Sequence, residues 1–86
     1  MLKKVMIQEI KVDNLLDCRG LFCPVPVLIT REEIEKLEPG QILQIIADDP
    51  AAEEDIPRWA KRTDNTILHK WKEGNDLYFI VRKGRA

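Results

Sequence analysis

The amino-acid sequence predicts an α+β fold, a two-layer α/β sandwich in which two helices cover one face of a four-stranded mixed sheet. Three patterns along the 86 residues support this prediction. Apolar residues recur at three- and four-residue steps over 24–37, as they do in an amphipathic helix. A short apolar run over 42–47 suits a strand buried on both faces. Two alternating segments, 66–72 and 76–83, flank a Glu-Gly-Asn turn and suit an antiparallel hairpin.

The first strand and the first helix are expected on either side of a glycine. Partial alternation of Ile10, Val12 and Leu16 ends at Gly20, which indicates a strand. The helical spacing that follows is opened by prolines and stopped by a Pro-Gly pair at 39–40. With the apolar strand next, the chain begins as strand, helix, strand.

A proline decides where we expect the second helix to begin. Pro57 lies within 51–63 and lacks the N–H that a helix interior needs. We therefore expect Asp55 to be the N-cap, with a looser turn before it and Pro57 in the first turn. Asp64 and Asn65 should end the helix, because asparagine tolerates the left-handed conformation of many helix exits.

The hairpin completes the order βαβαββ. Alternation places on one face of its first strand Ile67, His69 and Trp71. It places on one face of its second strand Leu77, Phe79 and Val81. The large aromatic residues expected in the core are Trp59, Trp71 and Phe79.

Length and charge limit the classes of protein that fit. The chain can bury one core, so we expect a single domain over 1–86, with 1–9 as a flexible N-terminal extension. Fourteen basic and fifteen acidic residues give a net charge of −1, which provides no general attraction for nucleic acid. The apolar runs are too short for a membrane span or a signal peptide. We therefore expect a cytoplasmic protein with no membrane partner.

The two cysteines, Cys18 and Cys23, are the residues most capable of chemistry. In a reducing cytosol such thiols are reactive, ligating or buried more often than they are paired. A structural zinc site needs four ligands, and His69 is the one histidine of the chain. We therefore expect no metal site.

Cys23 directly precedes the first helix, where unpaired N–H groups and the helix dipole favour a thiolate. We expect Pro24 at the first helical position, which leaves the Val25 N–H free to point at the sulfur. Arg19 would lower the pKa of the thiol further. The residues expected to support the thiolate and its turn are Arg19, Gly20, Pro24, Val25 and Pro26. The alternative is a small cysteine buried at a strand–helix junction.

The motif Leu16-Asp17-x-x-Gly20-Leu21-x-Cys23-Pro24-x-Pro26 resembles the signature of the TusA/SirA-like sulfur-carrier family. The resemblance covers roughly residues 10–83 and implies the same βαβαββ fold. It continues in order through Pro39-Gly40, Asp49-Pro50, Asp55-Ile56-Pro57-x-Trp59 and the closing strand 77–83. One departure is Asp64-Asn65, where the family often has Gly-His; the backbone role of that glycine could pass to Asn65.

The resemblance implies a sulfurtransferase that relays sulfur as a persulfide on Cys23. A cysteine desulfurase or a rhodanese-type protein would supply the sulfur, and a downstream acceptor protein would receive it. The pathways that such carriers serve include tRNA thiolation, cofactor maturation and sulfur oxidation. The reaction requires no metal or organic cofactor. We expect a monomer, because a carrier must expose one cysteine to two partners in turn.

Several roles remain open at this point. Cys18 could attack the persulfide of Cys23 or hold sulfur itself, but burial at the end of the first strand is favoured. A partner could dock on a basic edge of the second helix, although a solvated helix face is the favoured interpretation of those residues. Phe22 could be exposed beside the thiol as a contact anchor, or it could be tucked under the first helix. The docking candidates are Phe22, Arg58, Lys61 and Arg62. Two other functions stay in view: a non-catalytic interaction or regulatory module, and a redox switch between Cys18 and Cys23.

Overall fold

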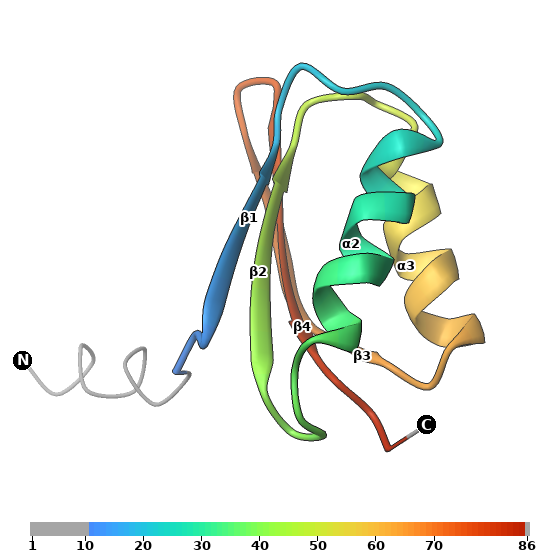
Figure 1. Ribbon diagram of the computed structural model, residues 1–86. Coiled ribbons are helices and arrows are strands. Elements are labelled where there is room, and N and C mark those ends of the chain that lie inside the picture. Colours follow the sequence, from blue (N-terminus) through green and yellow to red (C-terminus); the bar gives the residue numbers. More distant parts are fainter. Residues whose placement is uncertain (1–10, 86) are drawn as a thin grey trace, which may run out of the picture.

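The computed structural model describes residues 11–85 and has two layers, with both helices against one face of a sheet (Figure 1). This arrangement confirms the predicted α+β sandwich and its element order. The predicted extension over 1–9 and the alternation at Ile10 lie outside the described residues. The elements are β1 (Asn14–Cys18), α2 (Val25–Glu35), β2 (Ile42–Ala47), α3 (Ala52–Arg62), β3 (Thr66–Glu73) and β4 (Asp76–Arg82).

The sheet is mixed, with strand order β1-β2-β4-β3. β1 and β2 are parallel, whereas β4 is antiparallel to both β2 and β3. The parallel pair places Cys18 opposite Ala47, so β1 and β2 end at the same edge of the sheet. Both helices begin at that edge (Figure 1). Neither helix in the part of the chain that the structure describes is long and apolar enough to cross a membrane.

The core lies between the helices and the facing side of the sheet. β2 contributes Leu43, Ile45 and Ala47, which are fully buried, while Gln44 and Ile46 point to the other side and are half-buried. The expectation that β2 is buried on both faces was therefore wrong, because the helices cover one face of the sheet. The members of the core cluster are Cys18, Ile34, Leu43, Ile45, Ala47, Ala52, Ile56, Trp59, Ala60, Leu77, Phe79 and Val81.

α3 begins at Ala52, three residues before the predicted N-cap at Asp55. Its buried face runs through Ala52, Ile56 and Trp59, and burial of Ala52 favours helix in the turn that precedes Pro57. The Ala52 N–H donates to the carbonyl oxygen of Asp49 (2.9 Å), which closes the turn that leads into the helix. The free energy gained by packing Ala52 in the core therefore outweighs the cost of the backbone hydrogen bond that Pro57 cannot donate.

α3 is followed by a residue in the left-handed conformation, as predicted. That residue is Asp64, with φ of 64°, and not Asn65. The N–H of Asn65 donates to the Ala60 carbonyl oxygen (3.0 Å), as in a Schellman motif. The Asn65 side chain accepts a hydrogen bond from the Gly84 N–H (2.9 Å) and donates one to Thr63 Oγ1 (2.9 Å). The backbone role of the family's glycine thus falls on Asp64, while Asn65 ties the helix exit to the end of the chain.

Asp64→Gly is expected to stabilise the fold by about 0.5–1 kcal/mol, because glycine adopts positive φ without the steric cost of a Cβ. Asn65→Gly is expected to destabilise it by about 1–2 kcal/mol, since two side-chain hydrogen bonds are lost. Urea unfolding followed by circular dichroism measures both free energies. A loss of stability in Asp64→Gly would contradict this assignment.

A β-bulge in β3 changes which of its residues share a face. The pairing shifts between Ile67, which lies opposite Val81, and His69, which lies opposite Ile80. Ile67 therefore packs against the core, whereas His69 and Trp71 lie on the open face of the sheet. The prediction that these three residues share a face was wrong. Trp71 stacks on Tyr78, with ring centroids 4.9 Å apart, so it is not a core residue, whereas Trp59 and Phe79 are.

Candidate functional site

The candidate site lies where the turn after β1 meets the turn after β2. The parallel pairing of these strands brings the two turns together. The N–H of Gly20, at φ of 85°, donates to Asp48 Oδ1 (2.9 Å). The N–H of Cys23 donates to Asp49 Oδ2 (2.6 Å). Two successive aspartates therefore fix the segment that carries Cys23, and Gly20 adopts the positive φ that glycine tolerates.

Cys23 itself is exposed and faces α3. Its thiol donates a hydrogen bond to Asp55 Oδ2, with sulfur and oxygen 3.1 Å apart. The other oxygen of that carboxylate, Oδ1, lies 3.5 Å from Nη1 of Arg58. The sulfur is thus the first member of a chain of contacts from the cysteine through a carboxylate to a guanidinium group.

This environment raises the pKa of Cys23, contrary to the sequence-based expectation. The main cause is the hydrogen bond to Asp55, followed by desolvation and by the negative charges of Asp55 and Asp49. The helix begins at Val25 with Pro24 as its N-cap, one residue later than predicted. The N–H of Val25 donates to the carbonyl oxygen of Phe22 (2.8 Å) and is not available to the sulfur. Carboxylates therefore decide the ionisation of this thiol.

Arg19 does not support a thiolate either. Its Nε and Nη2 donate to the two carboxylate oxygens of Asp17 (3.0 and 2.8 Å), and its Nη1 lies 3.6 Å from Asp76. The hydrogen bonds from Arg19 hold the pKa of Asp17 at about 2. The guanidinium group is thus engaged by two carboxylates other than those around the thiol.

Alkylation of Cys23 by iodoacetamide is expected to rise with pH and to reach half its maximum above the ordinary thiol pKa. The thiolate is the reactive form, and a raised pKa moves its formation to higher pH. Rates measured by intact mass spectrometry between pH 6 and 10.5 give the midpoint. A midpoint below about 8.5, the ordinary thiol value, would contradict the described contacts.

The second cysteine, Cys18, lies in the core with no exposed surface. Desolvation raises the pKa of this thiol, and the charge of Asp17 raises it further. The structure thus agrees with the favoured interpretation of Cys18 as a buried residue at the end of β1. An attack on a Cys23 persulfide would require Cys18 to leave the core.

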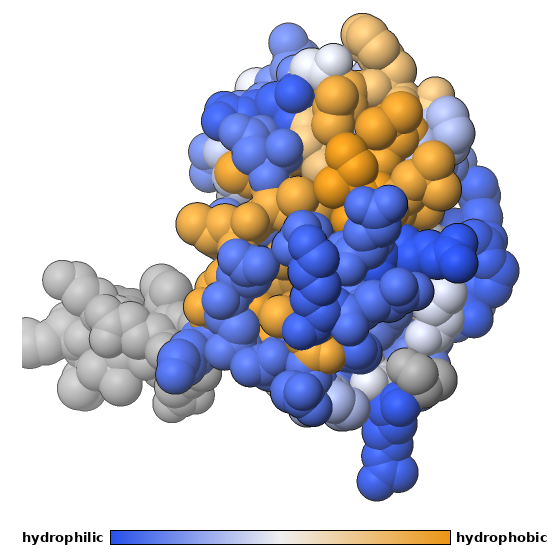
Figure 2. Space-filling view, in the orientation of Figure 1, coloured by the Kyte–Doolittle hydropathy of each residue, from blue (hydrophilic) through white to orange (hydrophobic). Residues whose placement is uncertain are grey.

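Apolar side chains are exposed around the start of α2. Phe22 is 72% exposed, Leu28 49% and Val25 38%. Figure 2 shows a hydrophobic area over the end of the molecule where the helices begin. Phe22 is therefore an exposed neighbour of the thiol and is not tucked under the helix. Such a surface beside an exposed thiol suits contact with another protein.

The comparison with known proteins identifies the family. A family model described as "Sulfurtransferase TusA" matches residues 14–83, which include Cys23 and the two carboxylates that contact it. The chain belongs to the TusA sulfurtransferase family. At the level of the family, sulfur transfer by a sulfur carrier is therefore shown, and the resemblance that the motif suggested is confirmed.

Two curated relatives in this family are each named "Putative sulfur carrier protein". One, from Aquifex aeolicus (strain VF5), is 41% identical over 80 residues, which are 92% of this chain but 41% of that protein. The other, YrkI from Bacillus subtilis (strain 168), is 39% identical over 74 residues, which are 86% of this chain and 99% of that protein. The crystal structure of a SirA-like protein from Desulfitobacterium hafniense has the same fold. Its TM-score is 0.73 at 18% identity, over 84% of this chain and 99% of that one.

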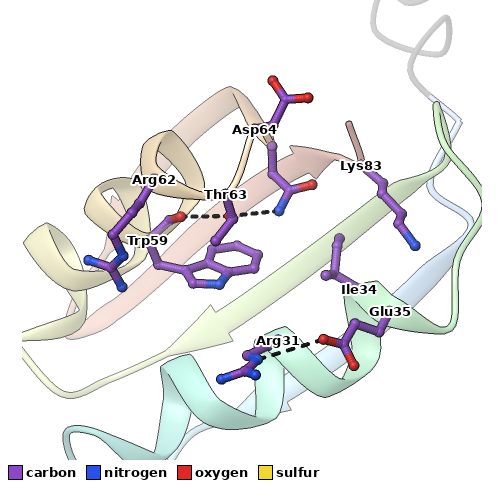
Figure 3. A pocket seen from close by; sticks show the side chains of 9 residues that line it. Arg31, Ile34, Glu35, Trp59, Arg62, Thr63, Asp64 and Lys83 are labelled. Atoms are coloured by element: carbon purple, nitrogen blue, oxygen red, sulfur yellow. Dashed lines mark hydrogen bonds and ion pairs between the residues drawn. The ribbon is translucent and has the colours of Figure 1, made fainter. Parts of the chain in front are cut away.

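The basic residues predicted on the second helix of this TusA-family chain lie toward the end of α3, between Arg58 and Arg62. Arg58 contacts Asp55, and Lys61 is exposed. Arg62 instead lines a cavity of about 380 Å³ between the ends of α2 and α3, together with Arg31 and Trp59 (Figure 3). Since both helices begin beside Cys23, this cavity lies toward their far ends. Of the basic residues, Arg58 alone contacts a residue that binds Cys23, within residues 11–85.

Sequence reasoning missed the two carboxylates that contact Cys23. Asp49 and Asp55 belong to motifs that carry the TusA resemblance, but the sequence predicts Asp55 only as a helix cap and assigns Asp49 no role at the site. The usable signal was that acidic residues follow the end of β2, which must lie beside the end of β1 in a parallel pair.

Proposed function

We propose that this chain carries sulfane sulfur as a persulfide on Cys23, receiving it from one protein and delivering it to another. The observation that carries the proposal is the contrast between the two cysteines. Cys23 is exposed beside apolar side chains, whereas Cys18 is fully buried. Membership of the TusA family supports sulfur as the transferred atom.

The reaction consists of two thiol–persulfide exchanges. In loading, Cys23 Sγ attacks the outer sulfur of the donor's persulfide, the S–S bond of the donor breaks, and the donor leaves as a thiolate. In delivery, the thiolate of the acceptor attacks the carried sulfur, and the Cys23 thiolate leaves. Each step breaks one S–S bond and forms another, so no metal or organic cofactor is required.

The proposed donor is a cysteine desulfurase or a rhodanese-type protein, and the proposed acceptor is a downstream protein with a reactive thiol. Both must reach the same sulfur, so they would bind in turn to the apolar surface formed by Phe22, Val25 and Leu28. The carrier would act as a monomer in the cytoplasm. The candidate pathways are tRNA thiolation, cofactor maturation and sulfur oxidation.

Incubation with a sulfur donor followed by intact mass spectrometry tests the proposal. The donor is either a cysteine desulfurase with cysteine or a rhodanese with thiosulfate. We expect a gain in mass of one sulfur atom. An unchanged mass with both donors would contradict the carrier function. A loss of two hydrogens with no added sulfur would indicate a disulfide between Cys18 and Cys23, and hence the redox switch.

Phe22→Ser is expected to slow loading from a protein donor by about tenfold, because loss of an exposed aromatic anchor weakens docking. Loading from inorganic polysulfide should stay within about twofold, since that reagent needs no docking surface. Leu15→Ser is the matched control: Leu15 is 66% exposed and lies on the open face of the sheet. Equal effects of both variants would remove the assignment of this surface to docking.

A further inference from the structure

We propose that Asp55 restrains Cys23 in the free carrier: its carboxylate keeps the sulfur as a protonated thiol, and Arg58 controls the strength of this effect through its contact with the same carboxylate. This inference rests on the proposed carrier function and adds a positioning residue to it. It starts from two contacts of one carboxylate, Sγ of Cys23 at 3.1 Å on Oδ2 and Nη1 of Arg58 at 3.5 Å on Oδ1.

The charged groups that face the sulfur come from two segments. The loop before α3 contributes Asp49, which accepts the N–H of Cys23, and α3 itself contributes Asp55. The first turns of α2 carry no ionisable side chain before Arg31. Arg19 is engaged by Asp17 and by Asp76. Within residues 11–85, the charged groups that act on the thiol are thus carboxylates, and Arg58 is a cation that contacts one of them, Asp55.

A carboxylate in this position has two effects. It accepts the hydrogen bond of the S–H group, and it repels a negative charge on the sulfur. Both effects lower the fraction of nucleophilic thiolate. They also make Cys23 a slower leaving group once it is loaded, because thiols of higher pKa leave more slowly. A free carrier therefore keeps its sulfur from adventitious thiols.

Arg58 makes the restraint adjustable. Its side chain is 62% exposed, and it is shared between Asp55 and Glu54, each at 3.5 Å, whereas the Asp55 side chain is only 25% exposed. A guanidinium group that moved toward Asp55 would offset its charge, and one that moved away would strengthen the hold on the thiol.

The proton has a defined route during loading. As Cys23 Sγ bonds to the outer sulfur of the donor, its proton passes to Asp55 Oδ2 and from there to the departing donor thiolate. Overall, a thiol and a donor persulfide become a Cys23 persulfide and a donor thiol, so atoms and charge balance.

The test compares pH profiles of iodoacetamide alkylation in a small set of variants. Asp55→Asn should move the profile to lower pH. Its alkylation rate at pH 7 should rise about threefold for each tenfold gain in the acidity of the thiol. The gain in rate is smaller than the gain in thiolate because a less basic thiolate is also a weaker nucleophile. Arg58→Gln should move the profile the other way. Glu53→Gln removes the same charge from a neighbouring position, which lines a cavity together with Lys70 and Lys72, and it should leave the profile unchanged.

The double variant Asp55→Asn with Arg58→Gln separates the two roles. If Arg58 acts through Asp55, the double variant should match Asp55→Asn. An equal shift from Arg58→Gln in both backgrounds would overturn the role given to Arg58. An unshifted profile in folded Asp55→Asn would overturn the restraint. Should Asp55→Asn not fold, Arg58→Gln alone decides, because removal of an exposed side chain leaves the fold intact and an unshifted profile contradicts the proposal.

A second readout is sulfur loss from carrier loaded with inorganic polysulfide. On exposure to dithiothreitol, Asp55→Asn should lose its sulfur at least threefold faster than wild type, and equal rates would contradict the restraint. A failure of the carrier function gives another result, because wild type would then take up no sulfur. A shift of the alkylation profile in Asp55→Asn would still support the proposed effect of Asp55 on the thiol. Normal loading with no alkylation shift would refute this inference alone.

Discussion

Cys23→Ser is expected to abolish sulfur loading completely, whereas Cys18→Ala is expected to load as wild type does. A serine hydroxyl cannot form the S–S bond of a persulfide, and Cys18 lies in the core with no exposed surface. Intact mass spectrometry after incubation with a sulfur donor measures the loaded fraction. Alanine is chosen at Cys18 because it places no polar side chain in the core.

Circular dichroism of both variants supplies the control for this prediction. Each variant must retain the wild-type spectrum before its loading is interpreted. Loading of folded Cys23→Ser would contradict the role of Cys23. Complete loss of loading in folded Cys18→Ala would show that the buried thiol takes part in the reaction.

Phe79→Ala is expected to destabilise the fold by about 3–5 kcal/mol, which approaches the whole stability of a small domain. The ring is 2% exposed and lies in the centre of the core cluster. Trp71→Ala should cost about 1 kcal/mol, because the indole stacks on Tyr78 on the open face and is only half-buried.

Urea unfolding at pH 7 measures the free energy of both aromatic variants on the same scale. The two variants test the register of β3, because alternation in the sequence assigns both residues to the core. The bulge in β3 instead places Trp71 on the open face of the sheet. Equal losses of stability would place Trp71 in the core and contradict the described register.

The fold could be predicted because its periodicities are strong. The apolar run of β2 and the helical spacing before it predict a helix layer on a sheet. The short turn of the hairpin predicts that β3 and β4 are antiparallel. The predicted start of α3 at Asp55 was wrong because burial of Ala52 stabilises the helical turn that precedes Pro57. The bulge between Ile67 and His69 carries no mark in the sequence, and it leaves Ile67 packed against the core.

The position of Cys23 just before a helix could be predicted, but the charges around its thiol could not. Position before a helix suggests free N–H groups around Cys23, yet the folded turn uses the N–H of Val25 for Phe22. The residue that binds the thiol, Asp55, lies 32 positions away in the sequence. Its approach depends on the parallel pairing of β1 with β2, which sets the two turns side by side. Local reasoning therefore gave the wrong direction for the pKa of Cys23.

The most direct measurement is the position of the added sulfur in the loaded protein. Trypsin cleaves after Arg19 and so separates Cys18 from Cys23. After loading by a sulfur donor and capping with iodoacetamide, tandem mass spectrometry of the two peptides locates the persulfide. We predict one extra sulfur on the peptide that contains Cys23 and none on the peptide that contains Cys18. Sulfur found on the Cys18 peptide, or on neither peptide, would contradict the proposal that this TusA-family chain carries sulfur on Cys23.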